Sequence, residues 1–168
     1  MARHYKSWSS LNKQLCDFLC PSLKDRVSFF LTRYHRVHDS YGRAAIRLDG
    51  QGLVCFSWIE KVRQESDLSA KLRETGRYVP DDPELKERWA WNCTYCEMDF
   101  LNAALDYLDM PVEDAIRSDQ AIIRILAVLD RRIGKRTLQR IYDEKEYLDY
   151  PQWQKQFYEL RFAAEHIS

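Results

Sequence analysis

The 168-residue chain has little glycine and little proline, with five residues of each. None of the glycines has the spacing of a phosphate-binding loop or a dinucleotide-binding turn, which excludes nucleotide-binding motifs of these kinds. Nor is there a run of about 18 apolar residues, the length that a membrane-spanning helix needs. Because Lys6 and Lys13 interrupt the first apolar stretch, we expect neither a secretory leader nor a membrane span.

Cysteine is also scarce, and the five residues are an odd number for a disulfide framework. We therefore predict a reduced, cytoplasmic protein with free thiols and no cofactor. Cys93 and Cys96 have the spacing of a zinc or redox pair, and Cys16 with Cys20 would complete a four-thiolate site if the two segments met. A cysteine also packs as a small apolar side chain, and core packing is the interpretation that we favour.

The chain is rich in core-forming residues, with 45% apolar and 13% aromatic side chains. A chain of this length buries roughly 70% of its unfolded surface. We therefore expect residues 1–168 to form a single domain. Two lobes, 1–74 and 83–168, are the alternative if the segment 75–83 is a linker.

The order of apolar periods predicts an α+β fold. Leu11, Leu15, Phe18 and Leu19 have helical spacing, and Pro21 ends that helix. Alternating apolar residues then predict three strands of an antiparallel meander, marked by Val27, Phe29 and Leu31, by Ala44, Ile46 and Leu48, and by Val54, Phe56 and Trp58. Residues 49–52 (DGQG) predict the second hairpin turn.

The remainder of the chain is expected to be mainly helical. Residues 59–74 form a charged, weakly amphipathic helix, and Asp82-Pro83 begins a helix that continues past Cys93 and Cys96 to Ala104. That helix is apolar nearly all round, so we expect it to be central. Shorter helices follow Pro111 and span 122–129, a break occurs at Gly134, and a terminal helix carries Trp153 and Phe157.

The net charge of zero conceals three blocks of unlike sign. Residues 1–63 have eleven Lys and Arg against five Asp and Glu, a net +6, whereas residues 64–120 have six against fourteen, a net −8. Residues 121–168 have nine against seven, a net +2. A partner would therefore meet a strongly polarised surface.

The sharpest basic feature lies in the last block. Its cations are Arg124, Arg131, Arg132, Lys135, Arg136 and Arg140, with Asp130 as the single acid among residues 124–140. Several cations at a helix end and the following helix start can contact a phosphate backbone or an acidic protein surface. The alternative is structural: Arg131 or Arg132 pairs with Asp130.

Arg43 and Arg47 form a second basic candidate. The strand pattern places both on the face opposite the core, near aromatic residues that can stack on bases. The order helix, three strands, helix in residues 8–74 also matches the order of a double-stranded-RNA-binding domain. Alternatively, the helical half of the chain covers this sheet face.

His35 and His38 support a rival hypothesis, a small metal-dependent hydrolase or nuclease. No serine or cysteine with a nucleophile signature accompanies them, and the carboxylates show no spacing that indicates an acid–base pair. We therefore predict no catalytic residue and no metal site, and an enzyme is the less favoured class.

Five segments resemble a family of small, uncharacterised bacterial proteins. They are residues 7–13, 42–44, 49–50, 129–136 with its Asp-Arg-Arg-x-Gly-Lys-Arg string, and 157–161. The resemblance implies one cytoplasmic unit and transfers no activity. Our leading hypothesis is a non-enzymatic binding protein acting through its basic surface. An acidic protein partner is preferred to nucleic acid because the net charge is zero, and self-association is a corollary of the polarised charge.

Overall fold

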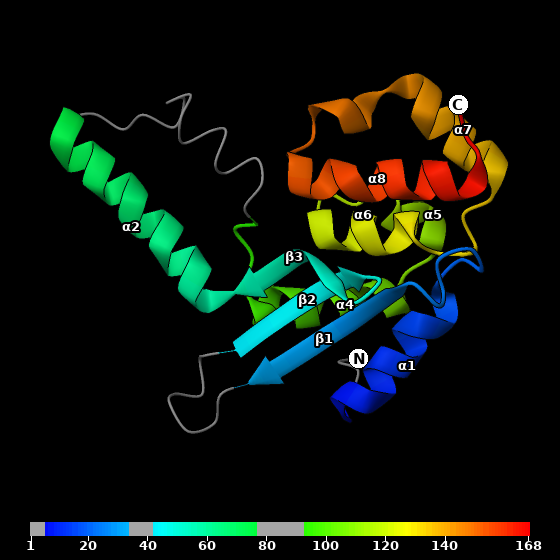
Figure 1. Ribbon diagram of the computed structural model, residues 1–168, viewed down its shortest axis with the longest axis horizontal. Helices are drawn as coiled ribbons and strands as arrows, with labels where there is room; N and C mark the ends of the chain where they lie inside the picture. The colour runs from blue at the N-terminus through cyan, green and yellow to red at the C-terminus, as the bar shows by residue number, and fades with distance from the viewer. Residues whose placement is uncertain (1–5, 34–41, 77–92) are drawn as a thin grey trace.

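The computed structural model describes residues 6–33, 42–76 and 93–168 (Figure 1). Helix α1 (Trp8–Phe18) precedes three strands, β1 (Val27–Arg33), β2 (Gly42–Leu48) and β3 (Gln51–Ser57). The helices that follow are α2 (Trp58–Thr75), α4 (Glu97–Asp109), α5 (Val112–Ala115), α6 (Ala121–Val128), α7 (Lys135–Glu144), the 3₁₀ helix η1 (Glu146–Asp149) and α8 (Gln152–Glu165). The predicted α+β class and element order are confirmed.

The strands form an antiparallel sheet in the order β1-β2-β3, as the meander prediction required. The turn between β2 and β3 is tighter than expected. Asp49 and Gly50 alone form it, with φ of 51° and 82°, the backbone of a two-residue hairpin turn. Gln51 and Gly52 already pair with β2. Trp58 was predicted to end the third strand, but it begins α2.

One face of the sheet packs on α4, and Phe100 is the residue at the centre of this contact. Its ring stacks on Phe56 with centroids 5.1 Å apart, and Phe29 lies 6.5 Å away on the same side. Ile46 is fully buried between these two positions of the sheet. This face is the inner face, so the other face of the sheet is turned away from α4.

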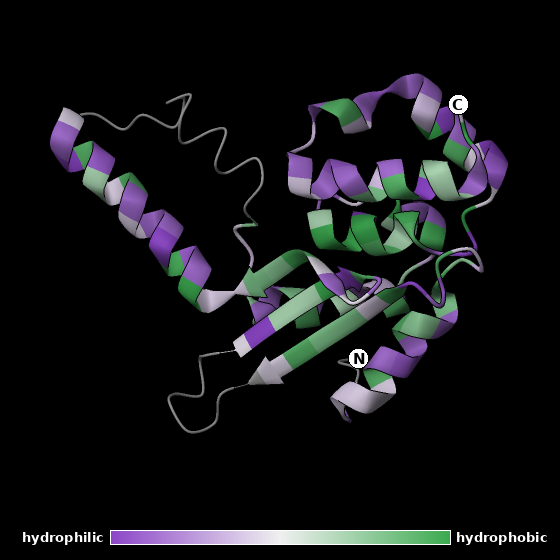
Figure 2. Ribbon diagram, viewed as in Figure 1, coloured by the Kyte–Doolittle hydropathy of each residue, from purple (hydrophilic) through white to green (hydrophobic). Residues whose placement is uncertain are grey.

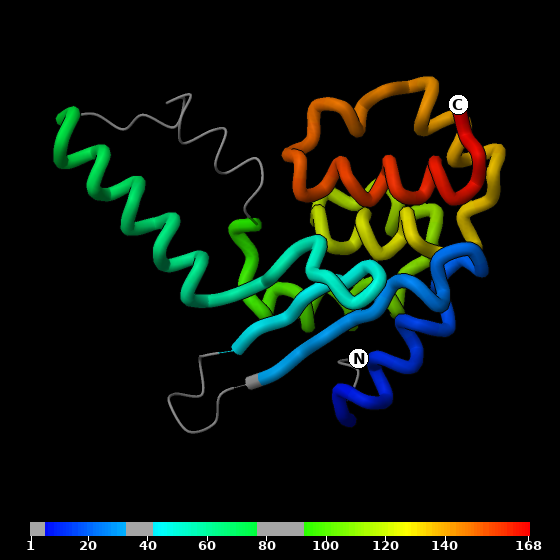
Figure 3. The backbone as a smooth tube through the Cα atoms, viewed as in Figure 1, coloured from blue at the N-terminus to red at the C-terminus, as the bar shows by residue number. Residues whose placement is uncertain are grey.

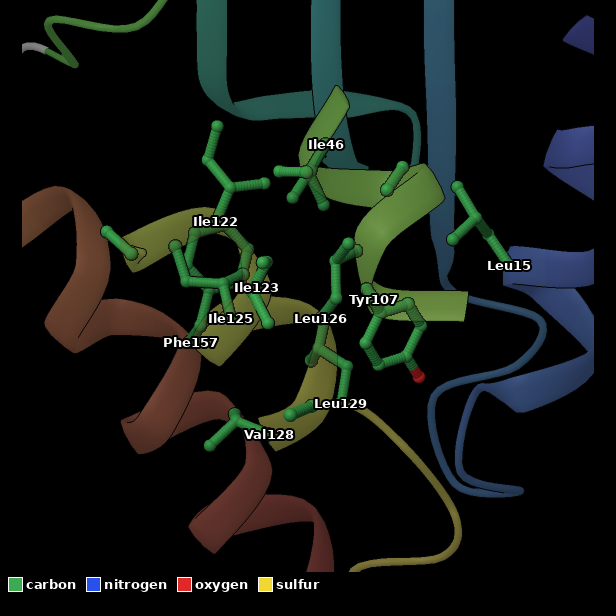
Figure 4. Close-up of a cluster of buried hydrophobic side chains, with 14 of the residues drawn as sticks. Leu15, Ile46, Tyr107, Ile122, Ile123, Ile125, Leu126, Val128, Leu129 and Phe157 are labelled. Atoms are coloured by element: carbon green, nitrogen blue, oxygen red, sulfur yellow. The ribbon is translucent and has the colours of Figure 1, made fainter. Parts of the chain in front are cut away.

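The most completely buried helix is α6, and α4, the described part of the helix predicted to be central, contacts α6, α1, β2 and β3. Seven of the eight residues of α6 are buried, and Figure 2 colours this helix almost wholly hydrophobic. It lies between α4 and α8, and Figure 4 shows Ile125 beside Phe157 of α8. The predicted helix from Asp82-Pro83 is wrong at residues 93–96, which are not helical. Its residues 82–92 lie outside the described part of the chain.

Helix α2 projects from the rest of the described structure, as the backbone tube in Figure 3 shows. Gln64 is its one buried residue, and Ile59 is 54% exposed. Because α2 does not return onto the sheet, the order in residues 8–74 does not build a double-stranded-RNA-binding domain. No helix within the described ranges is long and apolar enough to cross a membrane.

Candidate functional site

Residues 129–136, which are the loop between α6 and α7 and the first two residues of α7, surround a buried carboxylate. We call this segment the basic turn. The Asp130 side chain has no exposed surface. It accepts hydrogen bonds from the Tyr107 hydroxyl of α4, from the Arg132 backbone N–H at 2.7 Å and from Arg132 Nη2 at 2.7 Å. Arg132 Nε donates as well, so four donor groups satisfy a charge that would otherwise be costly to bury.

The guanidinium group of Arg132 is engaged within the protein, by Asp130 and by an aromatic ring. Its guanidinium carbon lies 3.9 Å from the centroid of the Phe18 ring, at the end of α1. The hydrogen bonds that Arg132 donates to Asp130 raise the pKa of Arg132 above its ordinary value. Burial and the bond to Asp130 raise the pKa of Tyr107, which keeps its hydroxyl a donor. Of the two interpretations of this arginine, the structure contains the structural one, in which Arg132 pairs with Asp130.

The last helix and the end of α1 hold the same turn. Arg161 of α8 is 2% exposed and donates to the carbonyl oxygens of Leu129 at 3.3 Å and Ile133 at 3.0 Å. The Arg131 N–H donates to the Phe18 carbonyl at 2.8 Å. In Figure 1 the turn accordingly runs beside the chain that leaves α1. The basic turn is thus fixed by α1, α4 and α8 together.

The remaining cations of the segment point into solvent. Arg131, Lys135 and Arg136 are exposed, and within the described ranges none of them forms an ion pair. Arg140 pairs with Glu144 at 3.8 Å, and both side chains are about half exposed. The five predicted binding residues therefore lie on one surface segment, but two of them have intramolecular partners.

The position of Lys135 and Arg136 is unfavourable for the helix that carries them. They are the first two residues of α7, whose first turn contains no acidic residue and whose N-cap is Gly134. A helix N-terminus carries positive partial charge, so cations there cost roughly 0.3–1 kcal/mol each. Helix stability therefore does not account for these two residues.

Arg43 and Arg47 lie on the outer face of the sheet, as predicted. Arg43 is exposed, and the guanidinium carbon of Arg47 lies 4.3 Å from the centroid of the Phe30 ring. In the described part of the chain no helix covers this face, so the alternative of a sheet buried on both sides does not hold there.

Cys93 and Cys96 do not lie in a helix, contrary to our prediction. Cys96 is the N-cap of α4, and its N–H donates to Asp99 Oδ2 at 2.8 Å. Burial raises the pKa of the Cys93 thiol to about 12, which makes it a poor nucleophile. Among the residues described, no group of three or more His, Cys, Asp or Glu is arranged to hold a metal ion.

The rival enzyme hypothesis depends on His35 and His38, which lie outside the described residues. The model of the SF0329 protein family matches residues 7–162, a range that contains the sheet and the basic turn. No curated protein and no solved structure matches the chain.

Proposed function

The chain belongs to the SF0329 protein family, and for this member we propose a non-enzymatic binding role in the bacterial cytoplasm. The contact surface is the exposed part of the basic turn and the start of α7, namely Arg131, Lys135 and Arg136. The partner is a protein with an acidic surface.

One observation carries this proposal: three exposed cations without described ion partners project from a turn that buried groups hold rigidly. A rigid surface loses little conformational entropy when it binds. Burying the Asp130 carboxylate and the Arg161 guanidinium group costs desolvation free energy. A turn that must keep one conformation gives a reason for this cost. Arg132 supports the turn rather than contacting the partner, because Asp130 and Phe18 already engage its guanidinium group.

A protein partner is favoured over nucleic acid at this site because the charges along α7 are mixed. Glu144 lies one turn beyond Arg140 and pairs with it, so the surface further along α7 is of mixed sign. A second copy of this chain is one acidic protein that qualifies, through its residues 64–120.

The test is a capture experiment with charge-matched variants. Immobilised wild type, R131E/K135E/R136E and the control K13E/K24E/K145E are exposed to nuclease-treated bacterial lysate. Lys13, Lys24 and Lys145 are also exposed, so both triple variants change the net charge equally. We expect an acidic protein that wild type and control retain and that the turn variant loses.

Two other outcomes of the capture experiment would decide between alternatives. Retention by all three proteins would contradict the proposal. If the retained protein is the chain itself, sedimentation of the purified protein should show a dimer that the turn variant lacks. Circular dichroism of each variant checks that the fold is unchanged.

A further inference from the structure

The outer face of the sheet is a second basic surface, independent of the basic turn. Strand pairing puts three rows of side chains across it: Thr32, Arg43 and Ser57 in the first, Phe30, Ala45 and Cys55 in the second, and Ser28, Arg47 and Gly52 in the third. The two arginines lie on the central strand, four residues apart, so their Cα atoms are separated by about 13 Å along the strand.

The charge of this face is strongly one-sided. Arg63 of α2 joins Arg43 and Arg47 along one open depression of about 920 Å³. Among the lining residues in the described part of the chain, Glu60 is the only acid, and its carboxylate accepts a hydrogen bond from Arg63 at 3.3 Å. Within the described ranges Arg43 and Arg47 have no ion pair. An anionic ligand would neutralise both.

The floor of the depression is made of small residues. Ala45, Gly52, Cys55 and Ser57 line it, and Ala45 and Ser57 are each 6% exposed. Small side chains between two long arginines let a ligand lie close to the sheet backbone. Each strand has seven residues, so the face is about 23 Å long and about 10 Å across. These dimensions suit one extended polymer strand.

Arg47 adds a stacking surface to the charge. Its guanidinium group is held over the Phe30 ring on one side, which leaves its other side for a ligand. Unpaired bases stack on arginine planes and aromatic rings, whereas bases within a duplex are not available for this contact.

We propose that the outer face of the sheet binds single-stranded nucleic acid. Arg43, Arg47 and Arg63 contact the phosphates, and the stacked Arg47 supports a base. The site lies on β2 and α2, whereas the basic turn joins α6 to α7, so the two proposals rest on different residues and fail separately.

The first test is fluorescence anisotropy with labelled single strands of DNA and RNA of about 12 nucleotides, and with a duplex of the same sequence. We expect the single strands to bind more tightly, with a steep loss of affinity on added salt. R43A/R47A should lower the affinity by at least about tenfold and reduce the salt slope by about two. R131E/K135E/R136E should keep single-strand binding.

Cys55 provides a second readout at the site itself. It is the exposed cysteine among five, and it lies on the floor between Arg43 and Arg47. Burial raises the pKa of its thiol, so alkylation by the neutral reagent N-ethylmaleimide is followed at about pH 8.5. Bound single strands should slow alkylation of Cys55 and leave the half-buried Cys16 unaffected.

Three results would overturn the proposal. One is single-strand affinity that is equal in wild type and R43A/R47A. Another is duplex binding as tight as single-strand binding. The third is alkylation of Cys55 at an unchanged rate under saturating oligonucleotide.

Discussion

The guanidinium group of Arg161 donates a hydrogen bond to the carbonyl oxygen of Ile133 at 3.0 Å. A buried side chain of the last helix thereby fixes a loop 28 residues earlier in the chain, and that loop carries the cations of the proposed contact surface.

Arg161→Met should destabilise the protein by about 3 kcal/mol, because it leaves two buried carbonyl oxygens without their charged donor. Arg161→Lys should recover less than half of this loss, since an ammonium group cannot reproduce the planar fork. Urea unfolding measures both. Lys155→Met, on the same helix, is the control and should change stability by no more than about 0.5 kcal/mol. Full rescue by lysine would show that the fork geometry is unimportant.

Asp130→Asn should cost about 3 kcal/mol, because it removes the charge that Arg132 and Tyr107 both contact. In the background of Arg132→Met the same substitution should cost clearly less, since the partner is already absent. A double-mutant cycle by urea unfolding gives the coupling. Arg131→Met should be nearly neutral. Additive effects at Asp130 and Arg132 would mean that their ion pair contributes nothing to stability.

Gly42→Ala should destabilise the sheet by roughly 1–3 kcal/mol. A Cβ atom at Gly42 would lie 2.7 Å from the Thr32 carbonyl oxygen and 2.8 Å from Glu97 Cγ. Displacing Glu97 would also disturb its bond from the Trp58 N–H, which satisfies the start of α2. Gly52→Ala is the matched control, since a Cβ there meets nothing within 4 Å. Thermal melts of both variants should separate them clearly.

Stability should fall as the pH rises above about 9. Burial raises the pKa of Tyr158 from 10.0 to about 12, and burial raises the pKa of Cys93 from 9.0 to about 12. The folded state therefore keeps protons that the unfolded chain has already released, so unfolding becomes easier between these values. Urea midpoints measured from about pH 8 to pH 11.5 test this. Tyr158→Phe should reduce the slope of the unfolding free energy against pH by the contribution of one proton.

The sheet was predictable because its two faces differ. Every second residue of each strand is apolar and faces α4, as Phe29 does on β1, Ile46 on β2 and Phe56 on β3, and this alternation alone indicates the strands. The length of the third strand was not predictable in the same way. Trp58 continues the alternation, but Glu97 binds its backbone N–H and starts a helix there. A partner 39 residues away leaves no local pattern.

The start of α4 had a local signal that the apolar period concealed. Cys96 and Asp99 form a reciprocal capping arrangement at the helix N-terminus, the spacing of a capping box. Cys93 and Cys96 fit the helical apolar stripe, so periodicity extended the helix too far towards the N-terminus. The cap, not the stripe, decides where the helix begins.

The candidate site was predictable as a segment but not residue by residue. Arg131 and Arg132 are neighbours of the same type, yet one points into solvent and the other binds Asp130. What separates them is Tyr107 and Phe18, which come from two other helices. Only the assembled fold brings these residues to the turn.

The dependence of the basic turn on α8 has a consequence for protein synthesis. A nascent chain that has been translated only as far as η1 contains all three exposed cations but lacks Arg161 and Glu165. At about 5–20 residues per second, the ribosome adds this helix within seconds. The turn therefore reaches its clamped shape only after α8 has left the exit tunnel, so the proposed contact surface is complete only at that stage.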